Sequence, residues 1–328
     1  MKPNASAARA APGRPLARGL QVLLLSGLAV LAVLGGAQRT RAAGAPTAER
    51  REFASPEQAA DALLAAVRSD DPHELLDILG PQGQELIQSG DPVADRNARQ
   101  RLLGAYDAAH RVERSGTSLA ALIVGTEAWA LPIPIVKQDS GWRFDTEASA
   151  QKILDRRVGR NELNVIEVCR AYVAAQREFA LAHPLGKHLH EYASQFESNP
   201  GKHDGLFWAT SPGQPLSPFG PLVARARAEG YVEREPGQPA TPYHGYYYRI
   251  LTSQGTHAPG GAKNYLVAGH MSGGFALLAF PAKWGDSGIM SFLVDQDGIV
   301  FERNLGPDTD RIARGITQFD PDLDWHAP

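Results

Sequence analysis

Three segments near the start of the chain share one helix-starting pattern, and this pattern constrains the fold of the whole region around it. In each segment, a Ser or Asp that can accept hydrogen bonds from the first helical turn precedes a proline suited to the first helical position. The three pairs are Ser55-Pro56, Asp71-Pro72 and Asp91-Pro92. The predicted helices cover residues 56–69, 72–79 and 92–110.

After Arg111 the hydrophobic pattern changes from helical spacing to alternation, which is typical of strands. Strands are predicted at Leu119–Val124, Trp129–Val136 and Trp142–Phe144. Pro132 and Pro134 cannot donate to a ladder, so the second strand should be bent or lie at an edge. Helices followed by an antiparallel meander predict helices packed on one face of a sheet. This order resembles the cone-shaped fold of the nuclear transport factor 2 superfamily.

The second half of the chain predicts a helical block followed by a sheet. Helices are expected at residues 147–157, 161–182, 186–197 and 218–230. Strands are expected at residues 243–252, 265–268, 274–280, 287–294 and 299–303, with Asp297-Gly298 as a hairpin turn. The predicted fold class is α+β, with N-terminal helices and a cone-like antiparallel meander, then a helical block and a C-terminal antiparallel sheet.

The first 37 residues have the pattern of a signal peptide. Basic residues without acidic ones precede an apolar run at residues 20–34, and Gly35-Gly36-Ala37 supplies small residues for cleavage. The run is about 15 residues, shorter than the roughly 20 that span a bilayer as a helix. We therefore expect cleavage near Ala37 and a periplasmic protein, without a lipidation cysteine. An uncleaved anchor is the alternative, and only then is membrane contact expected.

The whole chain is predicted to have five parts. These are a signal peptide (1–37), a flexible leader (38–52), an N-terminal α+β lobe (53–146), a helical block with a C-terminal aromatic β lobe (147–306) and a polar tail (307–328). The tail has few apolar anchors, so it is expected to fray.

The charge balance argues against nucleic acid as a partner. The whole chain has 33 Lys and Arg, four of them in residues 1–37, so 29 remain against 36 Asp and Glu, a formal charge of −7. An acidic chain with interspersed signs should be soluble and does not carry the basic footprint of a nucleic-acid-binding protein.

The Cys and His residues do not predict a metal or cofactor site. Cys169 is the only cysteine and lies on the apolar stripe of a predicted helix, so a buried, inert thiol is expected. The histidine cluster comprises His183, His188, His190 and His203. On a helix the rings of His188 and His190 would point about 200° apart, which disfavours a shared metal.

Three short motifs match the sequence patterns of catalytic or metal sites in part, but lack the surrounding structure or spacing that such sites require. Gly285-Asp286-Ser287-Gly288 matches the nucleophile segment of trypsin-like proteases, but the upstream half is predicted helical rather than as β-barrels. No helix follows His270-Met271-Ser272-Gly273-Gly274, as a nucleophile elbow requires. In Asp295-x-Asp297-Gly298 the glycine comes too early for a calcium loop. Turns between strands are expected at these places.

Several longer segments, in order, resemble a bacterial exported family called domain of unknown function 2950, from about Phe53 to Gly306. The segments are Ser55–Ala60, Ser89–Asp95, Arg156–Leu163, Tyr243–Arg249 and Ser287–Gly298. The resemblance implies export and a two-part body, and it supplies no catalytic residue.

Two groups of residues are candidate binding elements. Arg156, Arg157 and Arg160 could hold an anion at the start of the helix near Asn161, or form an interdomain ion-pair network with Glu162 and Glu167, which we favour. The second group is Tyr243, His244, Tyr246, Tyr247, Tyr248 and Arg249.

In a strand, Tyr246 and Tyr248 would face one side and Tyr247 with Arg249 the other. Aromatic residues on both faces predict a central strand with one face in the core. The other face would be either core as well or a groove for a ligand or peptide.

Together these features predict an exported, non-enzymatic binding or scaffold protein of the envelope, without metal or cofactor. Its partner would be an envelope protein or a peptide. A hydrolase with a site between the two lobes is the alternative. Kinship with secretion pseudopilin heads is a third hypothesis, which the Ala42–Ala48 segment with Pro46 disfavours because pseudopilin helices continue straight from the apolar segment.

Overall fold

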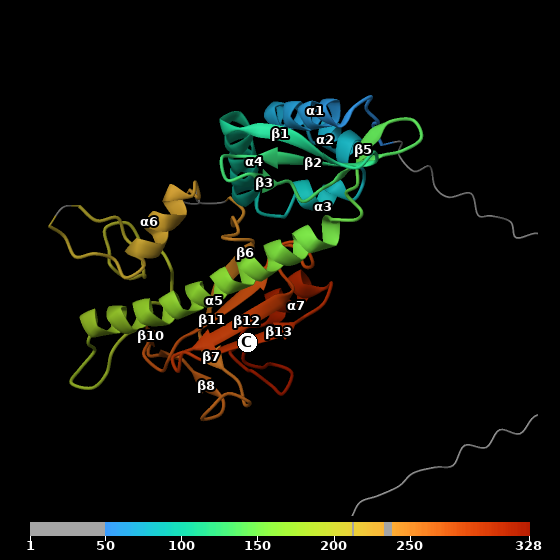
Figure 1. Cartoon of the computed structure of the whole chain (residues 1–328). Helices are drawn as coiled ribbons and strands as arrows, with labels where there is room; N and C mark the ends of the chain where they lie inside the picture. The colour runs from blue at the N-terminus through green and yellow to red at the C-terminus, as the bar shows by residue number, and fades with distance from the viewer. Residues whose placement is uncertain (1–49, 212, 233–237) are drawn as a thin grey trace, which may run out of the picture. The chain divides into compact units, whose positions relative to one another are not determined.

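The computed structural model describes residues 50–211, 213–232 and 238–328 (Figure 1). The predicted signal peptide and all but the last residues of the predicted leader lie outside this part. The described residues belong to one compact unit that contains two hydrophobic cores. The lobe boundaries given above stay a prediction.

The first core is built on the proline-started helices. They are α1 (Pro56–Ser69), α2 (Pro72–Leu79) and α4 (Pro92–Ala108), with a short unpredicted helix α3 (Gly83–Ile87) between the last two. Ser55 Oγ accepts from Gln58 N, and Asp71 Oδ1 accepts from His73 N at 2.8 Å. The start positions predicted from the caps are confirmed, because cap and proline act within one turn.

An antiparallel sheet packs against these helices. Its strands are β1 (His110–Ser115), β2 (Leu119–Val124), β3 (Trp129–Ala130), β4 (Ile135–Lys137) and β5 (Trp142–Phe144). The order is β1-β2-β4-β5, with β3 also paired to β2. The strand predicted over 129–136 is interrupted between β3 and β4, where Pro132 and Pro134 stand. Strand β1 is almost wholly exposed, so it carries no hydrophobic alternation by which to predict it.

Helix α5 (Ala150–Ala182) is one helix of 33 residues, not the two helices expected at 147–157 and 161–182. A single Gly costs a helix only about 1 kcal/mol relative to Ala, so Gly159 need not end it. The buried stripe also continues across this point, from Leu154 and Val158 to Val165 and Cys169. Tertiary burial of one continuous face therefore outweighs the local break signal.

The helix expected at 186–197 does not form, and this prediction is wrong. Tyr192 N donates to Met271 O at 2.8 Å, and Ala193 N donates to the side chain of Gln176 at 2.9 Å. Backbone groups that a helix would have paired locally are satisfied by distant parts of the chain instead. The next helix, α6 (Gly220–Ala228), lies inside the range predicted for it.

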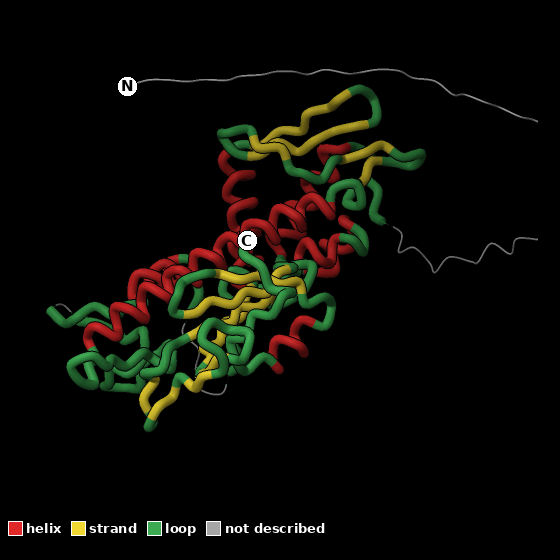
Figure 2. The backbone as a smooth tube through the Cα atoms, turned by 90° about the horizontal axis from the view of Figure 1, so that it is seen from below, coloured by secondary structure: helices red, strands yellow, loops and turns green. Residues whose placement is uncertain are grey.

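The second core lies on a four-stranded antiparallel sheet of order β13-β12-β11-β6. Its strands are β6 (Tyr246–Leu251), β11 (Ala276–Pro281), β12 (Met290–Asp295) and β13 (Val300–Asn304). Two short pairs, β7 (Ser253–Gln254) with β8 (Lys263–Asn264) and β9 (Leu266–Val267) with β10 (His270–Met271), lie outside it. Helix α5 contacts β11 and β12 and runs beside the strands in Figure 2. The α+β class and its order of parts are confirmed.

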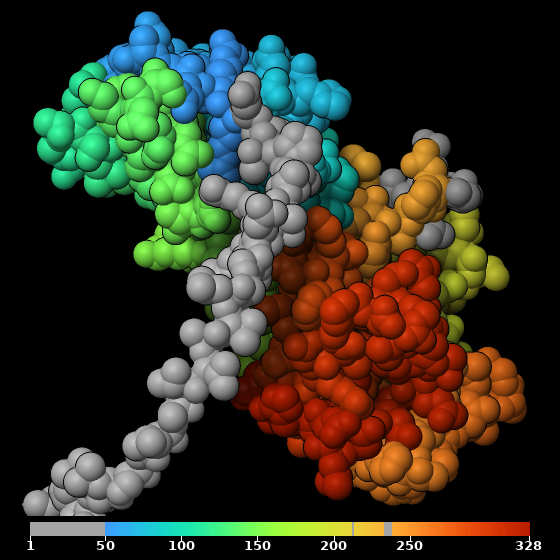
Figure 3. Space-filling view, turned by 90° about the vertical axis from the view of Figure 1, so that its right-hand side faces the viewer, coloured from blue at the N-terminus to red at the C-terminus, as the bar shows by residue number. Residues whose placement is uncertain are grey.

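The C-terminal segment is packed into this core, so the expectation that residues 307–328 fray is wrong. It forms α7 (Thr309–Gly315), and Phe319 behind it is fully buried. Phe319 N donates to Ser253 O, and Gly255 N donates to Phe319 O, both at 2.9 Å. In Figure 3 the red C-terminal residues lie against the orange residues that precede them. A few apolar side chains, Phe319 and Trp325 among them, anchor this segment in the second core.

No helix in the described part of the chain combines the length and apolar character that a membrane crossing needs.

Phe319→Ala should lower the free energy of unfolding by about 3–5 kcal/mol, because it leaves a cavity at a fully buried position. Leu323→Ala, in the same segment but fully exposed, should change it by about 0.5 kcal/mol or less. Urea unfolding of both variants measures the difference, and equal effects would mean that the C-terminal segment is not part of the core.

Candidate functional site

The aromatic strand predicted as central is the edge strand β6, so that prediction is wrong. Tyr246 is fully buried below the sheet surface, and its hydroxyl donates to Met290 O at 2.9 Å. Tyr247 and Tyr248 are only partly buried. The Tyr248 hydroxyl lies 3.5 Å from Tyr243 O. Tyr246 thus belongs to the core, while Tyr247 and Tyr248 pack against that core and keep part of their surface accessible.

Arg249 is less available than the sequence indicated. One nitrogen of its guanidinium donates to the carbonyl oxygens of Ala313 (2.6 Å) and Ile316, at the C-terminal end of α7. A cation at this end stabilises the unpaired carbonyls of the helix. Arg249 therefore fastens α7 to β6 and is not a free anion ligand.

Beside β6 lies a groove of about 710 Å³. Tyr243, Tyr247, Tyr248 and Arg249 contribute to its lining. The rest of the lining is mainly aromatic and aliphatic, and includes Phe207, Phe219, Leu222, Val223, Ala226, Phe280, Pro239 and Pro242. The rings of Tyr247 and Phe280 lie 5.6 Å apart. Four of the six predicted aromatic-strand residues therefore share one apolar groove, which we name the aromatic groove.

The outer edge of β6 faces away from β11, the one strand with which it pairs among the described residues. Tyr246 exchanges backbone hydrogen bonds with Tyr243, on the side away from β11. Because bonding direction alternates along an antiparallel strand, the backbone groups of Tyr248 and Ile250 also point away from β11. Within the described residues these groups have no backbone partner.

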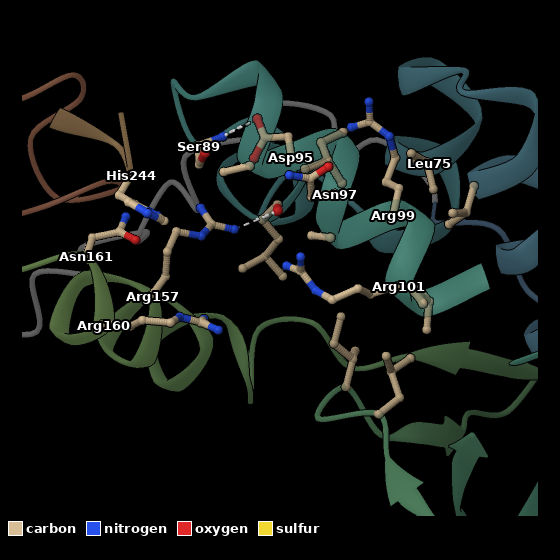
Figure 4. A pocket seen from close by; sticks show the side chains of 18 of the residues that line it. Leu75, Ser89, Asp95, Asn97, Arg99, Arg101, Arg157, Arg160, Asn161 and His244 are labelled. Atoms are coloured by element: carbon tan, nitrogen blue, oxygen red, sulfur yellow. Dashed lines mark hydrogen bonds between the residues drawn. The ribbon is translucent and has the colours of Figure 1, made fainter. Parts of the chain in front are cut away.

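A second cavity, of about 500 Å³, is shown in Figure 4. Arg99 and Arg101 reach it from α4, and Arg157 and Arg160 from α5. His244 lies at one end of it. We name it the arginine pocket. Arg156 is exposed and does not line it, so the three predicted arginines do not act as one group.

The ion-pair network expected for these arginines is wrong for Glu162 and Glu167. Glu162 accepts from the backbone N–H groups of Ile289 and Met290, each at 2.9 Å. Glu167 lies 3.8 Å from Arg225. Both carboxylates are thus committed elsewhere by the tertiary packing, which the sequence spacing does not reveal.

Arg157 instead holds the end of α3. Its Nη1 and Nη2 donate to Glu85 O and Leu86 O, both at 2.7 Å. Burial lowers the pKa of Arg157, and the nearby carboxylate of Asp95 opposes that shift. Asp95 accepts from Ser89 N at 3.0 Å, a bond drawn in Figure 4, and burial raises its pKa.

Two of the four arginines that line the arginine pocket were not singled out from the sequence. Arg99 lies 3.0 Å from Asp70, and Arg101 makes no ion pair within the described residues. The signal available was the basic run Arg96-Asn97-Ala98-Arg99-Gln100-Arg101. On a helix such a run is typical of a solvated face, so only its position opposite α5 indicates a site.

A buried hydrogen-bond network adjoins both cavities, because its member Tyr231 lines each of them. Asp91 is 1% exposed, and its Oδ2 accepts from the Tyr231 hydroxyl and from Gly245 N, both at 2.8 Å. Its Oδ1 accepts from the first N–H groups of α4 at 3.0 and 3.1 Å. Gly245 has φ +77°, and a Cβ there would lie 2.9 Å from Ser287 Cβ, so only glycine fits.

His244 stands next to this network on the pocket side. Its φ of +51° is a left-handed conformation that few non-glycine residues adopt. His244 Nε2 lies 3.1 Å from Glu229. Burial lowers the pKa of His244, while the carboxylate of Glu229 opposes the shift.

The remaining candidate positions have structural surroundings. Ser287 is fully buried and its Oγ exchanges hydrogen bonds with the backbone of Lys283, so the predicted turn is confirmed. Asp295 accepts from Asp297 N at 3.0 Å in the predicted hairpin turn. Cys169 is fully buried, which raises the pKa of its thiol to about 12. In the described part, no three His, Cys, Asp or Glu residues are placed to hold a metal ion.

The structure thus defines an α+β protein with two helix-covered antiparallel sheets, an aromatic groove and an arginine pocket. The chain belongs to the family described as "Protein of unknown function (DUF2950)", which it matches over residues 50–327. The match includes the C-terminal segment beyond Gly306, where the resemblance seen in the sequence ended. Neither a curated protein nor a solved structure matches the chain.

Asp91→Asn should lower the free energy of unfolding by about 2–4 kcal/mol. Asn can still cap α4, but its amide nitrogen cannot accept from Tyr231 or Gly245, which leaves buried donors unpaired. Asp71→Asn is the matched control, because Asp71 caps α2 before a proline and makes only the cap bond. It should cost about 0.5 kcal/mol or less. Urea unfolding that gives both variants the same loss would contradict the role assigned to Asp91.

Proposed function

We propose that this protein is exported to the cell envelope and binds an extended peptide segment of a partner along β6, in the aromatic groove. The proposal rests on one observation above all. An edge strand with outward-pointing backbone groups at Tyr248 and Ile250 borders a concave, apolar, aromatic-lined groove.

The chemistry of that edge favours a polypeptide over other ligands. A strand that adds to a sheet edge gains main-chain hydrogen bonds, while pockets beside the edge select alternate side chains. Strand β6 has six residues, which corresponds to about 20 Å of extended chain. A single peptide strand of similar length can therefore pair with it.

The walls of the groove favour apolar or aromatic side chains on the peptide. Tyr247 and Phe280 offer rigid rings that contribute contact area at little cost in side-chain entropy. Arg249 is held by α7 and contributes its aliphatic stem rather than a free charge. The affinity for the peptide should therefore depend on ring contacts and backbone hydrogen bonds more than on ionic strength.

No observation favours the hydrolase alternative. Among the described residues that line the two cavities, no serine or threonine hydroxyl is hydrogen-bonded to a histidine. Ser287, which stands in the segment that matches trypsin-like proteases, lines neither cavity.

Export is the second part of the proposal and is supported by the basic start, the short apolar run and Gly35-Gly36-Ala37. We expect the protein purified from the envelope fraction to have an intact mass that corresponds to cleavage near Ala37. A mass that still includes residues 1–37 would instead support an uncleaved anchor.

Peptides selected from a random library on the purified chain should share a pattern of alternating apolar residues. Tyr247→Ala should weaken their binding at least about tenfold, because it removes a central ring contact. Trp129→Ala removes an exposed aromatic residue of β3, outside the groove, and should leave binding unchanged. Fluorescence anisotropy with labelled peptides measures both effects.

N-methylation of the bound peptide tests the backbone pairing separately. Methyl groups on the alternate amides that face β6 should abolish binding, while methyl groups on the other amides should be tolerated. Binding that neither set of methyl groups weakens would refute strand addition. Binding that Trp129→Ala weakens as much as Tyr247→Ala would refute the groove as the site.

A further inference from the structure

The arginine pocket concentrates positive charge in a chain that is acidic as a whole. Arg99, Arg101, Arg157 and Arg160 line one cavity of about 500 Å³. The described lining contains two carboxylates, Asp95 and Glu229. Asp95 accepts from the backbone of Ser89, and Glu229 lies against His244. Positive charge is therefore in excess around the cavity.

The four arginines differ in their commitments. Arg99 lies beside Asp70, and Arg157 donates to two carbonyl oxygens of α3. Arg101 and Arg160 make no ion pair or side-chain hydrogen bond within the described residues. In Figure 4, Arg101 extends from α4 and Arg157 from α5 toward each other across the pocket, with Arg160 beside them. Like charges that line one cavity repel each other, and an anion bound between them would relieve the repulsion.

The other side of the same cavity is apolar and continues into the first hydrophobic core. Leu63 and Val67 of α1 and Leu75 and Leu79 of α2 contribute to its lining and are themselves core residues. Leu102, Leu131 and Ile133 extend this side toward the arginines. A small inorganic anion would leave this surface exposed to water, whereas a ligand with an apolar chain would cover it.

We propose that the arginine pocket binds a small amphipathic anion, with a carboxylate or phosphate head at Arg101 and Arg160 and an apolar chain against the leucine side. Guanidinium groups match the geometry of both head groups and form charge-assisted hydrogen bonds with them. The cavity volume lies within the range of small-molecule sites, about 300–1,000 Å³. This site is separate from the aromatic groove and stands whether or not a peptide binds there.

Isothermal titration with decanoate and with decyl phosphate tests the proposal and distinguishes the two head groups. At least one of them should bind, and decyltrimethylammonium, with the same chain and the opposite charge, should not. Shortening decanoate to octanoate and hexanoate should weaken binding about three- to fourfold for each methylene lost. Inorganic phosphate and acetate, which lack the chain, should bind far more weakly than their decyl counterparts.

Arg101→Gln and Arg160→Gln should each weaken binding at least about tenfold, because each removes a guanidinium that would hold the anionic head. Neither should lower the free energy of unfolding or cause aggregation, because both side chains are exposed. Arg156→Gln is the matched control, since it removes an exposed arginine of α5 that does not line the pocket. It should leave binding unchanged, as should Tyr247→Ala in the aromatic groove.

Any of four outcomes would overturn the proposal. Three of them are no binding of either decanoate or decyl phosphate, equal binding of decyltrimethylammonium, and equal weakening by Arg156→Gln and Arg101→Gln. Binding of inorganic phosphate as tight as that of decyl phosphate would also refute it, because the apolar side would then contribute nothing.

Discussion

The carboxylate of Asp91 accepts four hydrogen bonds that come from three separate parts of the chain. Two are the cap bonds of α4, and the others come from the Tyr231 hydroxyl and from Gly245 N. A carboxylate that is almost fully buried must be paired in this way, because an isolated buried charge is costly. The group that starts α4 therefore also fixes the turn that leads into β6.

Tyr231, which donates to this carboxylate, lines both the arginine pocket and the aromatic groove. Its ring lies 5.0 Å from that of Tyr243 and 5.9 Å from that of His244. Consecutive residues of one turn thus face different cavities, Tyr243 the groove and His244 the pocket. The positive φ of His244 and Gly245 makes this reversal possible.

Local signals in the sequence predicted the parts of the fold that depend on neighbouring residues. The caps and prolines at Ser55, Asp71 and Asp91 placed three helix starts correctly, because a cap acts within one turn. The Asp297-Gly298 turn was correct for the same reason. The break expected between residues 157 and 161 was wrong because burial of one long helical face decides there, and no local residue carries that information.

The sequence by itself determined the α+β class, the family, the helix starts and a buried Cys169, since each follows from short-range pattern or from composition. Only the tertiary structure decided that β6 lies at an edge, that Arg249 is held by α7 and that Arg101 and Arg160 line the same pocket. It also decided that Phe319 completes the second core. These features join residues far apart in the chain, and their energies arise from contacts that exist only once the chain has folded.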